Sequence, residues 1–143
     1  MPPEEPTPAL IDLRPYQTEA VARTFAAWAR GERATMFVCS TGGGKSLVFS
    51  KVAERHVAEG GGRVLVIADR HWLVEQARDN VLAHTSLSAG VEMAEERVSR
   101  EEPPQVVCAS VQSMVRRCAV LRPDHFDLIV IDEADLALAP SYR

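Results

Sequence analysis

Three glycines followed by a lysine and a serine form the first segment of this sequence whose residue types could do chemistry. Residues 36–39 are an apolar run that predicts a buried strand, and residues 47–57 have the apolar period of a helix. Between them stand the loop residues Thr41, Gly42, Gly43, Gly44, Lys45 and Ser46. Glycine lets backbone N–H groups converge on an anion, and a helix N-terminus adds unpaired N–H groups. The order strand, glycine loop, helix therefore predicts a phosphate-binding loop.

Within this loop, Lys45 is expected to reach the terminal phosphates of a nucleotide, and the Ser46 hydroxyl is expected to bind Mg²⁺. The usual pattern has a glycine where Cys39 stands, so the match is incomplete by pattern alone. The alternative interpretation is a glycine-rich turn with a solvated lysine. The strand and the helix on either side favour the phosphate-binding interpretation.

Two adjacent acids form a second candidate site at the end of another apolar run. Asp132 and Glu133 follow residues 126–131, which predict a buried strand. Ligands of open α/β sheets bind beyond the carboxyl ends of the strands. We therefore expect Asp132 to hold Mg²⁺, directly or through water, and Glu133 to orient and deprotonate an attacking water. The alternative is that both acids only cap a following helix.

The elements that must position these residues alternate between helices and strands. Helices are predicted at 16–30, 45–59, 72–82 and 111–118, with Ser110 as a plausible N-cap of the last. Strands are predicted at 36–39, 64–68, 91–94, 105–109 and 126–131. The face of the helix at 72–82 is expected to carry Leu73, Ala77 and Val81. This alternation predicts an α/β fold with a mostly parallel sheet and helices on both faces.

The composition indicates one domain of 143 residues, with a disordered tail at 1–9 and the folded part at 10–143. A net charge of −4 argues against nucleic-acid binding through the overall field, so any such contact must be local. No apolar run approaches about 18 residues, so no membrane span is expected. The three cysteines show no metal-ligand spacing, and two of them lie in apolar runs, which predicts buried small apolar side chains. A reducing, cytoplasmic compartment without structural disulfides is expected.

Three segments, in order along the chain, together resemble a known family. They are Arg14-Pro15-Tyr16-Gln17, the loop at 40–46, and Ile131-Asp132-Glu133-Ala134-Asp135. They are similar to the glutamine motif, motif one and motif two in the N-terminal motor domain of superfamily-two helicases and translocases. The resemblance implies a RecA-like P-loop NTPase fold and the use of ATP with Mg²⁺. Cysteine is a common variant at the position of Cys39 in that family.

The resemblance also implies roles for single residues. Gln17 would hydrogen-bond the adenine, Arg14 would support the base or its pocket, and Asp135 would couple motif two to later elements. For Gln17, the residues alone favour an exposed polar side chain at a helix start. The catalytic residues implied are Glu133 and Lys45.

Two further segments resemble the family motifs that contact the nucleic-acid backbone. Residues 69–76 are similar to motif Ia, and residues 110–113 to motif Ib. The contacts implied are Arg70, His71, Ser110 and Gln112. The alternatives are an ordinary solvated helix start for Arg70 and His71, and a plain N-cap for Ser110. The surroundings of Gln17 and Ser110 resemble restriction-enzyme and excision-repair motors more than RNA helicases, so DNA is favoured over RNA.

The sequence stops after motif two, before motif three and the second motor domain of that family. We therefore expect the chain alone to bind ATP–Mg²⁺ weakly, to hydrolyse it barely, and to neither unwind nor translocate. A second RecA-like domain, in cis or in trans, would complete the motor. The alternatives are a nucleotide- or nucleic-acid-binding module without motor activity, a fragment of an RNA helicase, or a different P-loop NTPase.

Overall fold

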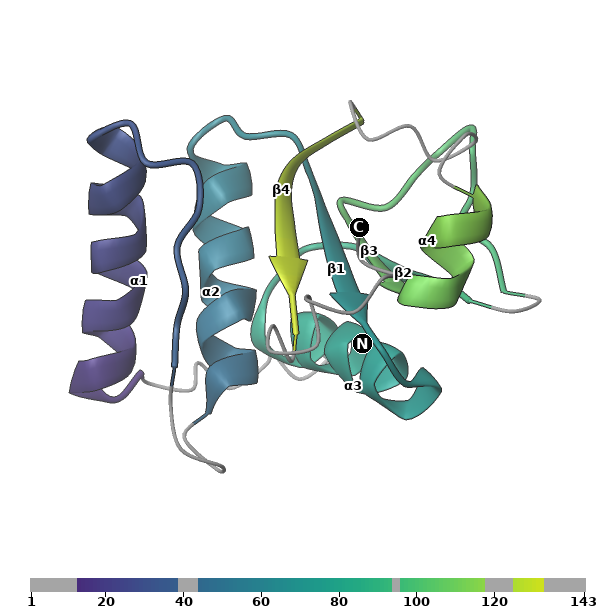
Figure 1. Ribbon diagram of the computed structural model, residues 1–143, viewed down its shortest axis with the longest axis horizontal. Coiled ribbons are helices and arrows are strands. Elements are labelled where there is room, and N and C mark those ends of the chain that lie inside the picture. Colours follow the sequence, from purple (N-terminus) through teal and green to yellow (C-terminus); the bar gives the residue numbers. More distant parts are fainter. Residues whose placement is uncertain (1–12, 39–43, 94–95, 118–124, 133–143) are drawn as a thin grey trace, which may run out of the picture.

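A four-stranded sheet is the centre of this computed structural model, which describes residues 13–38, 44–93, 96–117 and 125–132 (Figure 1). The described helices are α1 (Pro15–Ala29), α2 (Lys45–Ala58), α3 (His71–His84) and α4 (Val111–Arg117). The described strands are β1 (Arg63–Ala68), β2 (Ala89–Glu92), β3 (Val106–Ser110) and β4 (Phe126–Ile131).

The strands lie in the order β2-β3-β1-β4, and all three neighbouring pairs are parallel. Val66 of β1 aligns with Cys108 of β3 on one side and with Val130 of β4 on the other. Because parallel strands need crossover connections, helices come to lie on the faces of the sheet. The expected α/β fold with a parallel sheet is confirmed.

The side chains of β1 alternate between two apolar layers. Val64 and Val66 face one side, where they pack with Val81 and other buried residues of α3 and with Ala53 of α2. Leu65 faces the other side and packs with β3 residues and with Met114 of α4. Strand side chains point alternately to opposite faces, so one apolar run serves both layers. Helices therefore cover both faces, as expected.

Helix α1 packs against α2 and forms an outer layer beside it (Figure 1). Val21 of α1 meets Val48 and Val52 of α2 in a small apolar cluster. Pro15 occupies the first turn, where its missing N–H leaves no hydrogen bond unmade. With 15 residues α1 is the longest described helix, and no helix in the described ranges is long and apolar enough to span a membrane.

The prediction of a strand at 36–39 is wrong for residues 36–38, the part of this segment that the structure describes. Residues 36–38 form no strand, and the side chains of Met36 and Val38 are 77% and 81% exposed. This segment faces β4 across a pocket and does not pair with it. A strand exists only where a neighbour takes up its backbone hydrogen bonds, and an apolar run does not supply that neighbour.

The other predicted elements need only small corrections. The strand expected at 91–94 begins two residues earlier as β2, and the strand expected at 105–109 is shifted by one residue as β3. On α3, Val74 is buried with the expected Ala77 and Val81, and the expected Leu73 is half-buried and packs against the same cluster. Helix α4 begins at the expected residue, and Ser113 donates its backbone N–H to the Ser110 hydroxyl at 3.2 Å, so the N-cap prediction is confirmed.

Cys108 of β3 is a buried free thiol. Burial raises its pKa to about 12, so it stays protonated and unreactive near neutral pH. The expectation of a buried small apolar cysteine is confirmed for this residue. Cys39 and Cys118 lie outside the described residues.

Val81→Ala should destabilise the domain by about 2 kcal/mol, because Val81 is fully buried and its truncation leaves a cavity under α3. Leu82→Ala on the same helix is the matched control, since the Leu82 side chain is 48% exposed, and it should cost less than about 0.5 kcal/mol. Urea unfolding followed by circular dichroism measures both. Equal losses would show that α3 does not cover the sheet in the way described.

Candidate functional site

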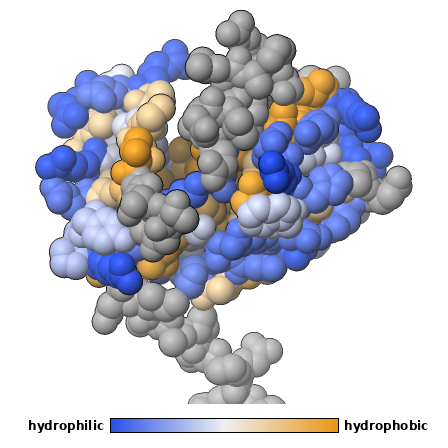
Figure 2. All heavy atoms as spheres, turned by 60° about the horizontal axis from the view of Figure 1, so that its bottom comes forward, coloured by the Kyte–Doolittle hydropathy of each residue, from blue (hydrophilic) through white to orange (hydrophobic). Residues whose placement is uncertain are grey.

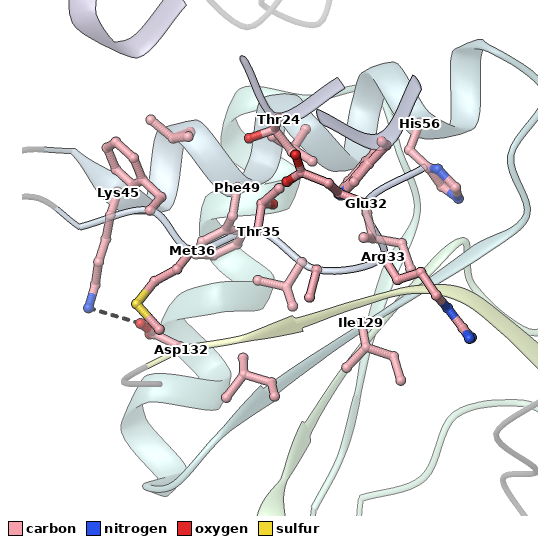
Figure 3. Close-up of a pocket in the computed structure, with 18 of the residues that line it drawn as sticks. Thr24, Glu32, Arg33, Thr35, Met36, Lys45, Phe49, His56, Ile129 and Asp132 are labelled. Carbon is pink, nitrogen blue, oxygen red and sulfur yellow. Dashed lines mark ion pairs between the residues drawn. The ribbon is translucent and has the colours of Figure 1, made fainter. Parts of the chain in front are cut away.

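An ion pair joins the two segments that carry the chemistry. The Lys45 ammonium lies 3.0 Å from Oδ1 of Asp132 (Figure 3). Lys45 is the first residue of α2, and Asp132 directly follows β4. The Asp132 backbone N–H donates to the carbonyl of Ile67 at 3.0 Å, which fixes the end of β4 against β1. The structure thus brings together the lysine and the acid that the sequence placed in two separate motifs.

Gly44 begins helix α2 in a backbone conformation that favours glycine. Its φ is 74°, in the left-handed region, and its carbonyl accepts hydrogen bonds from Leu47 and Val48. Gln17 of α1 donates from Nε2 to the same carbonyl at 3.5 Å. A Cβ at Gly44 would overlap Gln17 Nε2. The last glycine of the loop is therefore fitted closely to a side chain from the preceding helix.

Gln17 is 3% exposed, so its interpretation as an exposed polar residue is wrong. Its Oε1 accepts the backbone N–H of Arg14 at 2.8 Å, which holds the carboxamide in place at the start of α1. The Arg14 side chain is exposed. Gln17 thus links the first turn of α1 to the glycine loop, and its predicted contact with adenine stays a prediction.

A pocket of about 660 Å³ lies beside the ion pair. Its walls are residues 32–37, one side of α2 including Phe49, and the outer edge of β4 including Ile129. Figure 3 shows Lys45 and Asp132 at one end of this pocket, with Arg33 and His56 at the other. Ile129 is 49% exposed, whereas four of the six residues of the central strand β1 are buried. On the face shown in Figure 2, hydrophobic areas lie between hydrophilic residues.

The predicted nucleic-acid contacts follow the ends of the two central strands. Arg70 is the N-cap of α3 and His71 its first residue, and both are exposed beyond the end of β1. Gln112, in the first turn of α4, is exposed beyond the end of β3. Ser110 is 1% exposed, and its hydroxyl lies 2.9 Å from that of Ser113. Of the four residues, Ser110 alone does not reach the surface.

Several predicted site residues lie outside the described ranges: Thr41, Gly42, Gly43, Glu133 and Asp135. Ser46 is described as the second residue of α2 and is half-buried. Its carbonyl accepts a hydrogen bond from the Ser50 hydroxyl at 2.7 Å. The roles predicted for these residues stay predictions.

The sequence reasoning missed a buried carboxylate. Glu92 is 0% exposed and is paired with Arg100 and Arg117. The charged composition of residues 95–104 is typical of a loop and does not by itself indicate this pairing. A glutamate between the apolar Val91 and Met93, with arginines following it, is the signal that could have indicated a buried ion pair.

Gly44→Ala should destabilise the domain more than Gly60→Ala does. Both glycines have a positive φ, 74° and 86°, so both substitutions carry the left-handed backbone cost of roughly 1–2 kcal/mol. An added Cβ at Gly60 meets nothing within 4 Å, whereas one at Gly44 meets Gln17. The difference, expected at about 1 kcal/mol or more, is measured by urea unfolding. Equal losses would mean that Gln17 does not pack against the loop.

Comparison with known proteins finds relatives along almost the whole chain. The family described as type III restriction enzyme, res subunit, matches residues 10–143. The putative ATP-dependent helicase IRC3 of Saccharomyces cerevisiae is 29% identical over 138 residues, which are 92% of this chain and 20% of that protein.

Two solved structures share the fold. The UvsW helicase from bacteriophage T4 has a TM-score of 0.71 at 22% identity, covering 92% of this chain and 46% of that one. A nuclease-deletion mutant of the type ISP restriction-modification enzyme LlaGI, in complex with a DNA substrate mimic, has a TM-score of 0.69 at 19% identity, covering 87% of this chain and 15% of that one.

This chain therefore spans less than half the length of each of these relatives. The family match and the helicase relative confirm the resemblance to the N-terminal motor domain of superfamily-two helicases, and the two structures confirm its RecA-like fold. Because the family match covers residues 10–143, the chain belongs to the type III restriction enzyme res subunit family.

Proposed function

We propose that this chain is the ATP-binding half of a DNA-dependent motor, a helicase or translocase. The observation that carries the proposal is the ion pair between Lys45 and Asp132, which joins the glycine loop to the end of β4. A lysine at a glycine loop and an acid at a neighbouring strand end are the two charges that an ATP–Mg²⁺ site needs. The helicase relative supports the same assignment.

The side chains at this site fit the chemistry of ATP–Mg²⁺. Asp132 and Ser46 would hold Mg²⁺, because a carboxylate and a hydroxyl supply the oxygen ligands that this cation prefers. Lys45 would contact the terminal phosphates, and the N–H groups of the loop would supply further donors. The ammonium already faces the carboxylate, so the positive and the negative partner of such a site are held side by side. When bound, Mg²⁺ would neutralise charge on the phosphates.

Base recognition is assigned to Gln17, with Arg14 beside it. A carboxamide offers two donor hydrogens and two acceptor positions, which suit the donor and acceptor groups on an adenine edge. The contact between Gln17 and Gly44 would couple base binding to the position of the glycine loop. This assignment favours ATP over GTP.

DNA is the proposed nucleic acid, and its backbone the proposed point of contact. Arg70, His71 and Gln112 are exposed beyond the ends of the adjacent strands β1 and β3. Contacts from such residues position a strand without reading its sequence. One of the solved structures with this fold is in complex with a DNA substrate mimic, which supports DNA as the substrate class.

Rapid hydrolysis would require a second motor domain. Glu133 is proposed to activate the attacking water, but the charge that develops on the transferred phosphoryl group also needs cationic side chains facing it. We propose that a second RecA-like domain supplies them, in cis or in trans. The chain alone is then expected to bind ATP–Mg²⁺ weakly and to turn it over barely.

Lys45→Met should weaken the binding of ATP–Mg²⁺ by at least about tenfold, because a charged hydrogen bond to phosphate is lost. Lys51→Met is the matched control: Lys51 is the only other lysine, and it donates to the His84 carbonyl at 2.9 Å, away from the loop. Isothermal titration calorimetry with and without Mg²⁺ measures both variants. Equal affinity in the wild type and in Lys45→Met would refute the proposed site.

Gln17→Ala should reduce the preference for ATP over GTP, because the base contact is lost while the phosphate contacts stay. The affinity ratio of the two nucleotides, measured by competition with a fluorescent ATP analogue, reports this. A parallel fall in both affinities would instead assign Gln17 to holding Gly44, and an unchanged ratio with unchanged affinities would remove it from the site.

A further inference from the structure

A buried carboxylate beside α4 is the strongest feature that the proposed function does not use. Glu92, the last residue of β2, has an exposed fraction of 0%. Its Oε1 accepts from Arg100 Nη2 at 2.9 Å and from Arg117 Nη1 at 3.1 Å. Its Oε2 accepts from the backbone N–H of Val98 at 2.9 Å and from Arg100 Nη1 at 3.3 Å. We call Glu92, Arg100 and Arg117 the Glu92 cluster.

The Glu92 cluster stays charged at neutral pH. Burial alone would raise the pKa of Glu92, but the hydrogen bonds from Arg100 and Val98 and the charges of both arginines outweigh it, so the pKa lies below its ordinary value. A carboxyl group with a lowered pKa stabilises the fold above its unfolded pKa and loses that contribution as the pH falls through the folded pKa. The cluster therefore remains an intact ionic contact under physiological conditions.

Arg117 connects this contact to α4. It is the last residue of that helix, its side chain is 13% exposed, and its Nη1 also donates to the Glu96 carbonyl at 3.2 Å. Arg100 and Val98 tie the segment before β3 to the same carboxylate. One carboxylate thus joins β2, residues 96–100 and the end of α4.

The described part of helix α4 spans seven residues and therefore depends on an anchor. Helices of this length are unstable without tertiary contacts. Val111 and Ser113 are its buried residues, and Met114 adds a partly buried contact with the sheet. Its start is fixed by the cap between Ser110 and Ser113, and its end by Arg117. Between these two fixed ends, Gln112 is exposed.

We propose that the Glu92 cluster is a positioning device for DNA contact: by holding the last turn of α4, it fixes the orientation in which the first turn presents Gln112 to the backbone of single-stranded DNA. This inference rests on the proposed function and adds to it three positioning residues. None of them touches the DNA. They act through α4, from the side of the sheet that carries Leu65 and Val107.

The test compares two neighbouring arginines of α4. Arg117→Met removes the contact with Glu92 but leaves the carboxylate paired with Arg100 and Val98, so the fold should persist. Arg116→Met removes the same charge from an exposed position in the same turn. Arg117→Lys keeps the charge and should restore part of the binding. Fluorescence anisotropy with a labelled oligothymidylate measures affinity, calorimetry measures ATP–Mg²⁺ binding, and circular dichroism checks folding.

Arg117→Met should lose DNA affinity by about 3- to 30-fold, and Arg116→Met by no more than about twofold. ATP–Mg²⁺ binding should be unchanged in both, which a general loss of structure would not allow. Equal losses of DNA affinity in Arg117→Met and Arg116→Met would overturn the inference but not the proposed function. The same holds if Arg117→Met and Arg117→Lys both lose affinity for DNA and for ATP–Mg²⁺. A wild-type chain that binds ATP–Mg²⁺ but no DNA would overturn both the inference and the DNA part of the proposed function.

Discussion

Parallel pairing around β1 is the constraint on which the rest of the structure depends. Because β3 and β4 both run in the direction of β1, the segments that follow these strands emerge at one edge of the sheet. Asp132 and Arg70 follow β4 and β1, and Ser110 is the last residue of β3, so they lie at the ends of strands that are neighbours in space but distant in sequence. An antiparallel β4 would place Asp132 at the opposite edge, far from Lys45. The sheet direction therefore decides that a site exists at all.

The second constraint is the close fit at Gly44. A left-handed residue at the start of α2 turns the chain from the loop into the helix, and Gln17 from another helix packs against it. The same glycine thus serves the backbone turn and the contact between α1 and the loop. The contact between Gln17 and Gly44 therefore holds α1 against α2 in addition to the apolar cluster of Val21, Val48 and Val52. It also offers a physical connection between the proposed base contact at Gln17 and the glycine loop.

The two faces of the sheet are stabilised in different ways. The face under α3 is apolar, and Val74, Ala77 and Val81 of that helix pack on it. Their burial favours folding, but the hydrophobic effect is not directional and does not fix the orientation of the helix. The face under α4 has a smaller apolar cluster and adds the charged contacts of Glu92. A buried carboxylate with two guanidinium partners is directional, and removing one partner is costly. Such contacts suit a short helix whose orientation matters.

The sequence by itself determined the fold class, most of the elements and the identity of the paired charges. Apolar runs of β-branched residues indicated β1 and β4, helical spacing indicated α1 to α3, and the hydroxyl of Ser110 indicated the start of α4. These signals are local, because they depend on the side-chain period and on hydrogen bonds within a few residues. Lys45 and Asp132 could each be named as site residues because each stands in a motif with a known chemical role, whereas their ion pair is seen only in the structure.

Only the tertiary structure decided which runs find a partner. Residues 36–38 are an apolar run, yet they form no strand and face β4 across a pocket. Strand formation depends on a neighbouring strand that pairs with the segment, and not on the apolar run alone. Ser110, a candidate both for an N-cap and for a nucleic-acid contact, is buried, and its hydroxyl bonds with that of Ser113. Glu92 falls within the strand predicted at 91–94 and is the centre of an ionic cluster with Arg100 and Arg117. For residues 36–38 and for the pairing of Glu92 with Arg117, the outcome depends on contacts between segments that are distant in the sequence, which residue type and spacing do not encode.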